Sequence, residues 1–284
     1  MPAKLTISPE LSKTTLPYWK PIIFLCLIST VLISIASRKD AYLSSQRAIF
    51  SLLNHALQIM PSEIWYNITY MGDALILIPF LSFICLINTR MWAAIFGAIP
   101  LAFSLSHLSK SFFSIPRPAA VLDHQNMTII GDTLTAYTSF PSGHTITIFT
   151  AMSAIVFVGF KETLISRELN SGLLLAVFLI ASIVGISRVA VGAHWPADIV
   201  MGAIVGIISG LSGEYISRKY LNWWHWKIEK KAYLGCFILT FSFILFASMI
   251  SGKLPELIII WTAIIISALV GTYITLKTLL DNET

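Results

Sequence analysis

Long apolar runs, separated by short polar segments, set the pattern of this chain. Eight of these runs approach the ~20 residues that a helix needs to cross a bilayer, and they fall near 21–37, 66–88, 91–109, 143–160, 171–187, 197–215, 232–251 and 256–276. Inside lipid, only helices and closed barrels satisfy every backbone polar group, and uniformly apolar runs of this length are helical. The pattern therefore predicts an all-α fold, a polytopic membrane helix bundle.

The first run and the polar stretch after it predict two different kinds of helix. The run at 21–37 follows a polar leader, residues 1–20, and lacks a convincing small-residue cleavage site. We interpret it as an uncleaved first helix, with a removed signal peptide as the alternative. Apolar residues then recur at steps of three and four within 43–60, at Phe50, Leu53, Leu57 and Met60. This spacing predicts an amphipathic helix that lies at the membrane interface.

Composition agrees with a membrane protein. Of the 284 residues, 56% are hydrophobic and 12% are charged, and the mean hydropathy is +0.79, whereas a soluble domain carries about 25% charged residues. The net charge of +5 is spread over short segments that flank the apolar runs. We therefore expect membrane lipids as partners and exclude nucleic acid. The cysteines lack the spacing of a zinc site or a disulfide framework, and all lie in apolar runs: Cys26, Cys85 and Cys236.

The distribution of lysine and arginine predicts how the chain is oriented. If every run crosses the membrane, 12 of these residues fall on the side of the termini and 7 on the other side. Three of those 7 belong to the polar clusters described next. Because basic residues concentrate in cytoplasmic loops, we expect cytoplasmic termini and an extracytoplasmic opposite face. That face is periplasmic in a bacterial inner membrane, the location we favour, or lumenal in a eukaryotic endomembrane.

Three polar clusters lie at the ends of apolar runs, and all emerge on the extracytoplasmic face. They are Lys110 with Arg117, then Pro141-Ser142-Gly143-His144, then Ser187-Arg188 with His194 and Asp198. Together they hold three cations, two histidines and one carboxylate. Fixed cations, an oriented nucleophile and a proton donor are the groups that phosphoryl transfer requires.

The third cluster supplies a candidate nucleophile. Asp198 follows His194 by four residues, with Pro196 between them as a residue suited to the first turn of a helix. Residues four apart share a helical face, so Asp198 can hold one ring nitrogen of His194 and leave the other unprotonated for attack. A purely structural His–Asp pair is the alternative, and the nearby Arg188 argues against it.

The other two clusters are candidates for holding a phosphate. Ser142 is expected to cap a helix whose first N–H groups, at Gly143 and His144, face an anion. His144 is also placed to protonate a leaving alkoxide. Arg117, in a loop stiffened by prolines, can turn back towards Lys110, and arginine suits bidentate capture of phosphate oxygens. Each cluster alone has a simpler interpretation. The one with Ser142 could be an ordinary helix cap, and Lys110 could be a cation that reaches the membrane interface.

In this order and spacing the clusters resemble the signature of the type 2 phosphatidic acid phosphatase superfamily, K-x6-R-P, P-S-G-H and S-R-x5-H-x3-D. The resemblance implies the superfamily's six-helix membrane core within residues 21–220, with a further transmembrane hairpin in 221–284. It implies that His194 forms a phosphohistidine, that Asp198 orients His194, and that His144 protonates the leaving group. The residues that would cradle the phosphate are Lys110, Arg117, Ser142, Gly143 and Arg188. Soluble vanadium haloperoxidases share the pattern, but the membrane composition argues against that branch.

We therefore expect a lipid phosphatase that acts on a phosphate monoester or pyrophosphate at the extracytoplasmic face. No aspartate cluster lies near the motifs, so we expect no metal and no other cofactor. The candidate substrates are undecaprenyl pyrophosphate, phosphatidylglycerophosphate, phosphatidic acid and the phosphates of lipid A. A phosphotransferase that passes the phosphoryl group to a second lipid shares the first half-reaction and is the main alternative. A transporter or scaffold that only binds phospholipid is a further one.

Two polar features near the clusters have open roles. Asp73 lies in the second run, near its extracytoplasmic end, where a carboxylate is costly. We expect it either to pair with a cation of the site or to make a structural hydrogen bond. The loop 119–140 either covers the site and recognises a headgroup or is a surface connection, and its polar residues include Asp123, His124, Asp132 and Tyr137.

Two features are expected to serve structure alone. Gly202, Gly206 and Gly210 recur every four residues and predict a smooth face for close helix packing. The stretch Trp223-Trp224-His225-Trp226 precedes a basic segment and predicts an aromatic belt at the interface.

Overall fold

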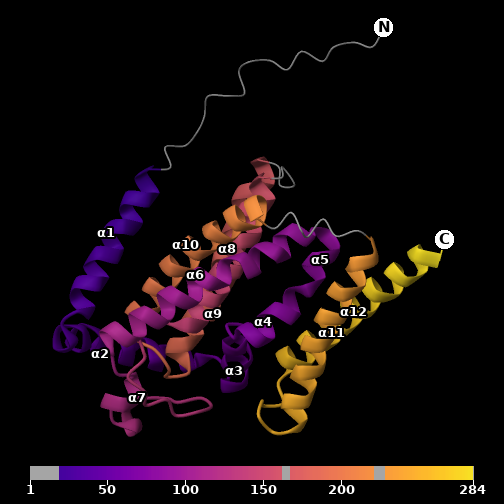
Figure 1. Ribbon diagram of the computed structural model, residues 1–284. Coiled ribbons are helices and arrows are strands. Elements are labelled where there is room, and N and C mark those ends of the chain that lie inside the picture. The colour runs from indigo at the N-terminus through magenta and orange to yellow at the C-terminus, as the bar shows by residue number, and fades with distance from the viewer. Residues whose placement is uncertain (1–18, 162–166, 221–227, 284) are drawn as a thin grey trace.

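The apolar runs of the sequence form helices that pack side by side in a computed structural model, which describes residues 19–161, 167–220 and 228–283 (Figure 1). The long helices are α1 (Trp19–Ala36), α6 (Thr89–Phe113), α8 (Gly143–Lys161), α9 (Arg167–Ala190), α10 (Pro196–Tyr220), α11 (Ile228–Ile250) and α12 (Ile258–Glu283). The shorter helices are α2 (Lys39–Ala56), α3 (Ser62–Tyr70), α4 (Ala74–Phe80), α5 (Ile84–Ile87) and α7 (Pro118–Val121), with 3-10 turns η2 (Leu57–Ile59), η3 (Leu81–Phe83) and η4 (His124–Asn126). The predicted all-α membrane bundle is confirmed. Residues 1–18 of the predicted leader and the tryptophan belt, within residues 221–227, lie outside the described part.

Six helices in the described part of the chain are long and apolar enough to cross a membrane, and they lie between Thr89 and Asp281. The two expected spans before them differ from the prediction. The described apolar part of α1, Ile23–Ala36, is shorter than a full span. The second span is not one helix, because Ser62–Tyr70 and Ala74–Ile87 meet at an angle of 78°.

Gly72 and Asp73 explain the bend in the second span. Asp73 ends the helical continuity as the N-cap of α4, and its Oδ1 accepts a hydrogen bond from Leu75 N at 2.8 Å. Gly72 lies so close to α8 that a Cβ there would be 2.6 Å from Cβ of His144. The chain therefore bends where it passes beside the second cluster. The hydrogen bond from Leu75 N is the structural role that we considered for Asp73.

Helix α10 is joined to its neighbours through glycine. A Cβ at Gly206 would lie 2.5 Å from Cβ of Phe149, and one at Gly210 would lie 2.5 Å from Cβ of Ser153, both on α8. A Cβ at Gly202 would lie 2.9 Å from the carbonyl oxygen of Ser142, just before α8. The predicted packing role of the glycine stripe is confirmed. Because backbones approach this closely, α10 and α8 are held in a fixed register.

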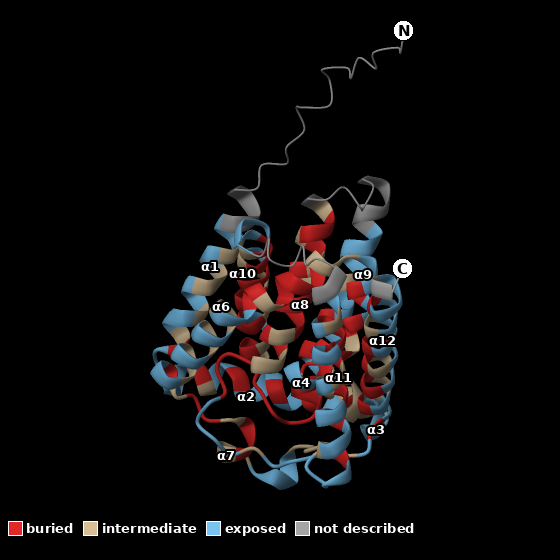
Figure 2. Cartoon of the chain, turned by 45° about the vertical axis from the view of Figure 1, so that its right-hand side comes forward, coloured by how far each residue is buried: buried red, intermediate tan, exposed pale blue. Residues whose placement is uncertain are grey.

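The C-terminal hairpin packs against the bent second span. Between α11 and α12, a Cβ at Gly271 would lie 2.9 Å from the carbonyl oxygen of Gly235. Asn67 Oδ1 in α3 accepts a hydrogen bond from Ile259 N at the start of α12, at 3.1 Å. Figure 2 shows buried residues gathered around α8, whereas the outer faces of α1, α11 and α12 are exposed. Large apolar side chains occupy these outer faces, among them Phe24 and Phe243, as lipid contact requires.

Replacing Gly213 by alanine should destabilise the protein. The added Cβ would overlap the carbonyl oxygen of Ala94 in α6 and lie 2.8 Å from Cβ of Ala98. Because the backbone of α6 cannot move aside cheaply, we expect a loss of about 1–3 kcal/mol. Gly172→Ala is the matched control, since a Cβ at this helical glycine meets nothing within 4 Å. Thermal unfolding in detergent measures both, and equal midpoints for the two variants would contradict the packing role of Gly213.

Candidate active site

The third cluster is built around the turn that starts α10. Asp198 Oδ2 accepts a hydrogen bond from Trp195 N at 2.9 Å, which closes the first turn of the helix. The same oxygen lies 3.1 Å from Nδ1 of His194. His194 precedes α10, so the pair joins a turn to a helix and does not lie on one helical face. Both side chains are buried, His194 at 2% and Asp198 at 0% exposure, which leaves little room for another orientation of the ring.

Two further side chains donate to Asp198. The hydroxyl of Ser139 donates to Oδ2 at 2.6 Å, and that of Tyr42 donates to Oδ1 at 2.5 Å. Burial and the neighbouring carboxylate raise the pKa of Tyr42 well above its ordinary value of 10.0, so the phenol keeps the proton that it donates. An ionised Asp198 can therefore accept a hydrogen bond from Nδ1–H of His194, which leaves a lone pair on Nε2.

Arg117 lies at the other nitrogen of His194. Its Nη1 is 3.3 Å from Nε2 of His194 and donates to the carbonyl oxygen of Ala193 at 3.2 Å. Its backbone is fixed by a hydrogen bond from Arg117 N to the carbonyl oxygen of Ala136, at 3.2 Å. The buried Nε of Arg117 has no hydrogen-bond partner among the described residues. A guanidinium with a spare donor thus borders the nitrogen that carries the lone pair.

Arg188 brings the end of α9 to the same place. Its carbonyl oxygen accepts hydrogen bonds from Ala193 N at 2.9 Å and from His194 N at 3.1 Å, which folds the connecting segment back on itself. Nη1 donates to the hydroxyl of Thr69 in α3. The side chain is buried, and its Nε, like that of Arg117, has no hydrogen-bond partner among the described residues.

The second cluster starts α8 and is tied directly to the third. Ser142 Oγ accepts from Thr145 N at 3.4 Å, as expected of an N-cap. Ser142 N donates to the carbonyl oxygen of Asp198 at 3.1 Å. Lys110, in the last turn of α6, reaches this helix start, because a Cβ at Gly143 would lie 3.2 Å from its Nζ. The structure therefore brings residues of all three clusters together.

The free site is strongly electropositive. Burial lowers the pKa of His194 well below its ordinary value of 6.5, and the positive charges of Arg117 and Arg188 lower it further, followed by that of Lys110. His194 is therefore neutral near pH 7. A neutral, oriented imidazole among fixed cations can attack an anion that those cations bind.

The loop between α7 and α8 is strapped across this end of the bundle (Figure 1). Ser139 N donates to the carbonyl oxygen of Ile115 at 3.0 Å, and Ile130 N donates to that of Val191 at 3.3 Å. Two of the polar residues that we singled out serve the loop itself: Asp123 caps η4, and His124 Nε2 contacts the carbonyl oxygen of Ala119 at 2.9 Å. The other two, Asp132 and Tyr137, are exposed. Ser139, which the sequence interpretation passed over, is the loop residue that touches Asp198.

Helix α2 contributes a stripe that the sequence interpretation missed. The sequence placed Phe50 and Leu53 on one apolar face of an interfacial helix, but Leu53 is 38% exposed and the helix buries every fourth residue instead. This stripe, called here the α2 stripe, consists of Tyr42, Gln46, Phe50 and Asn54. Gln46 Oε1 accepts from Ala197 N at 2.9 Å, and the Phe50 ring meets that of Trp195 edge to face at 5.3 Å. Asn54 Nδ2 donates to the carbonyl oxygens of Val189 and Ala190 in the last turn of α9. In the sequence, polar and aromatic residues that recur every four positions were the signal that could have indicated this stripe.

Comparisons with known proteins agree with this geometry. Residues 91–227 match the sequence model of the PAP2 superfamily, that is, the type 2 phosphatidic acid phosphatases. Over these residues the chain is similar to the PAP2 superfamily. The predicted resemblance is confirmed, and the matched range contains all three clusters. It does not contain α2, so the α2 stripe lies outside the PAP2 match.

Individual relatives match shorter stretches. The chain is 38% identical over 86 residues to the lipid A 1-phosphatase of Porphyromonas gingivalis, covering 29% of this chain and 17% of that protein. It is 40% identical over 73 residues to the bacitracin transport permease protein BcrC of Bacillus licheniformis, covering 26% of this chain and 30% of the relative. The chain thus spans less than a third of the length of either relative.

Two solved structures also match. The phosphatidylglycerolphosphate phosphatase of Bacillus subtilis, a transmembrane PAP2 protein, shares the fold at a TM-score of 0.54 and 20% identity, covering 71% of this chain and 98% of that one. LpxE of Aquifex aeolicus has a TM-score of 0.49 and 29% identity, covering 62% of this chain and 95% of that one.

Tyr42→Phe should slow turnover and move its pH dependence. Loss of one hydrogen bond to a charged group costs about 1.5 kcal/mol, or about tenfold in kcat. In the wild type the acid limb of kcat/KM should lie below pH 6.5, because the pKa of His194 is lowered. Without the Tyr42 donor, Asp198 presents more negative charge to His194, the pKa of His194 rises, and the limb moves to higher pH.

Gln46→Leu is the control for this prediction. It breaks the neighbouring contact of the α2 stripe, with Ala197 N, and leaves the donors to Asp198 in place. It should lower the unfolding midpoint without moving the acid limb. If Tyr42→Phe also leaves the limb unmoved, Tyr42 acts only in packing.

Proposed function

We propose that the chain is an integral-membrane lipid phosphatase that works through a phosphohistidine at His194. The observation that carries the proposal is the orientation of this ring, with Nδ1 at 3.1 Å from Asp198 and Nε2 at 3.3 Å from Nη1 of Arg117. The nitrogen with the lone pair thus lies beside a guanidinium that suits phosphate oxygens. This arrangement supports nucleophilic attack on a bound phosphate.

In the first half-reaction, Nε2 of His194 attacks phosphorus and the bond from phosphorus to the lipid oxygen breaks. His144 donates a proton to that departing oxygen. Arg117, Arg188 and Lys110 stabilise the charge on the remaining oxygens, together with the N–H groups at the start of α8. In the second half-reaction, water attacks the phosphohistidine, His144 takes a proton from the water, and phosphate leaves.

The proposal includes no metal. In phosphoryl transfer a metal offsets the charge of the transferring group, and here three fixed cations and a helix start occupy that position. Within the described residues, no three histidine, cysteine, aspartate or glutamate side chains lie close enough together to hold a metal ion.

An apolar cavity beside the site supports a lipid as the substrate. Its volume is about 230 Å³, and it lies between α4, α6 and α8. Gly143 of the phosphate-binding cluster is one of its lining residues, and the others are mainly apolar, among them Leu77, Ile99 and Phe103. An acyl or prenyl chain can lie in this cavity while the phosphate at its end reaches the cations.

Among the candidate substrates, we place the phosphates of lipid A first, because one relative is a lipid A 1-phosphatase with 38% identity in the matched region. Phosphatidic acid, phosphatidylglycerophosphate and undecaprenyl pyrophosphate follow in a screen of phosphate release. A phosphotransferase remains the main alternative. The second relative is named a transport permease protein, which would fit the alternative of a phospholipid transporter. The oriented pair of His194 and Asp198 favours catalysis instead.

Substitutions at the two histidines should separate their roles. His194→Ala should lower phosphate release from lipid and from p-nitrophenyl phosphate alike, by at least about 10³-fold, because both need the nucleophile. His144→Ala should lower release from lipid by about 10²–10⁴-fold but spare the aryl ester, whose leaving group needs no proton.

His124→Ala is the matched control, since this histidine contacts only the loop carbonyl of Ala119 in the described contacts. Undiminished lipid turnover in His194→Ala would refute the nucleophile. With lipid labelled in its phosphate, free labelled phosphate indicates the hydrolase, and a labelled second lipid indicates the phosphotransferase.

We also propose that the active site faces the periplasm and the termini face the cytoplasm, on the basis of the lysine and arginine distribution. An alkaline phosphatase reporter inserted after Val121, at the end of α7, should be active. The same reporter fused after residue 284 should be inactive. The reverse pair of results would invert the topology.

A further inference from the structure

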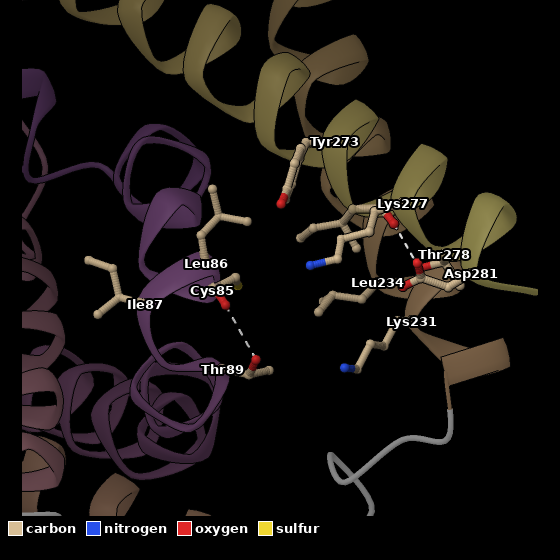
Figure 3. Close-up of a pocket in the computed structure, with 11 residues that line it drawn as sticks. Cys85, Leu86, Ile87, Thr89, Lys231, Leu234, Tyr273, Lys277, Thr278 and Asp281 are labelled. Atoms are coloured by element: carbon tan, nitrogen blue, oxygen red, sulfur yellow. Dashed lines mark hydrogen bonds between the residues drawn. The ribbon is translucent and has the colours of Figure 1, made fainter.

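A second cavity lies at the opposite end of the bundle. It has a volume of about 440 Å³ and is enclosed by the ends of α11 and α12 on one side and by α5 and the start of α6 on the other (Figure 3). Thr89 lines it at the start of α6, whereas Lys110 of the active site is in the last turn of the same helix. At 1.5 Å per residue these positions are about 30 Å apart, the thickness of a bilayer core. The cavity and the active site therefore serve opposite leaflets.

Positive and hydroxyl groups point into this cavity. Figure 3 shows the ammonium groups of Lys231 and Lys277 and the hydroxyl of Tyr273 directed towards the space that faces α5. Nζ of Lys277 lies 5.8 Å from the centre of the Tyr273 ring. Asp281 also lines the cavity, but it is drawn on the far side of Lys277. The face of the cavity opposite α5 therefore offers donors and positive charge to an anion.

The remaining wall is apolar and continues onto the lipid-facing surface. Leu234 lies on the hairpin side, and Leu86 and Ile87 lie on the α5 side. Leu86 is 49% exposed and Ile87 is 70% exposed. In a membrane bundle, side chains exposed at this depth contact acyl chains. A ligand with an anionic end and an apolar body matches both walls.

We propose that this cavity binds the headgroup of an anionic phospholipid from the leaflet opposite to the active site. Lys231 and Lys277 bind the phosphate of the headgroup, and an acyl chain follows Leu86 and Ile87 out to the bilayer. All the lining residues lie outside residues 91–227, so the site is independent of the PAP2 match and of the proposed activity. A bound lipid bridges the C-terminal hairpin and the core at their seam.

Native mass spectrometry of the detergent-purified full chain tests the proposal, with added phosphatidylglycerol as the probe. Each lysine near a membrane surface contributes roughly fivefold to anionic lipid binding, so the double variant Lys231→Ala/Lys277→Ala should bind about thirtyfold more weakly than the wild type. The control Lys219→Ala/Lys253→Ala removes two exposed lysines away from the cavity and should bind as the wild type does. Binding at the active site is common to all three proteins and cancels in the comparison.

Two further probes decide the identity of the ligand. Phosphatidylcholine, whose headgroup has no net charge, should bind more weakly than phosphatidylglycerol and respond less to the double variant. Inorganic phosphate should not compete for the lysine-dependent binding, and full competition would show a free-phosphate site and overturn the lipid assignment. Equal phosphatidylglycerol binding by the wild type and the double variant would also overturn the proposal.

A second measurement uses the wild type alone and so does not depend on how the variants fold. Phosphatidylglycerol with a photoactivatable group in its headgroup should label peptides that contain residues 85–89, 231–234 or 273–281. Labelling confined to the active-site end of the bundle would refute the site.

Discussion

A carboxylate without access to solvent must receive its hydrogen bonds from the protein, and this requirement at Asp198 organises the site. Its donors come from α2 through Tyr42, from the loop before α8 through Ser139, and from the turn before α10 through Trp195 N. A buried charge that loses its partners costs about 3–5 kcal/mol. Segments more than a hundred residues apart are thus coupled at one side chain. The orientation of His194 follows from this coupling, because the same carboxylate oxygen that closes the helix turn also meets Nδ1.

The cations of the site create the opposite requirement. Arg117 and Arg188 each keep a buried Nε without a hydrogen-bond partner among the described residues, and like charges that converge repel one another. A bound oxyanion relieves both costs, since it accepts from the spare donors and offsets the positive charge. The same cations lower the pKa of His194 in the free site. The cations proposed to bind phosphate therefore act together with burial to keep the proposed nucleophile neutral before phosphate arrives.

The features that could be predicted from the sequence are those that depend on residues close together in the chain. Helix parity placed Lys110, His144 and Arg188 at one end of the bundle, and the spacing of His194 and Asp198 indicated their pairing. The bend at Gly72 and Asp73 did not follow, because hydropathy over 66–88 is continuous and the bend depends on the approach to His144. Tyr42 and Ser139 were missed for a related reason. Each donates to a residue 156 or 59 positions away, and neither belongs to a motif with its own chemical pattern.

The α2 stripe shows why an amphipathic pattern alone misleads at such a site. A helix at a membrane interface is expected to bury apolar residues, yet α2 buries Gln46 and Asn54. Gln46 accepts from Ala197 N at the start of α10, and Asn54 donates to carbonyl oxygens in the last turn of α9. The turn between α9 and α10 carries His194, so α2 holds both ends of the segment on which the proposed nucleophile lies. The apolar cavity meets the phosphate cluster at Gly143 from the other direction, along α4 and α6. The donors to Asp198 come from α2, the loop before α8 and the turn before α10, whereas α4, α6 and α8 line the cavity. Under the proposed function, residues that line the cavity can therefore change the lipid that fits while Asp198 and its donors stay in place.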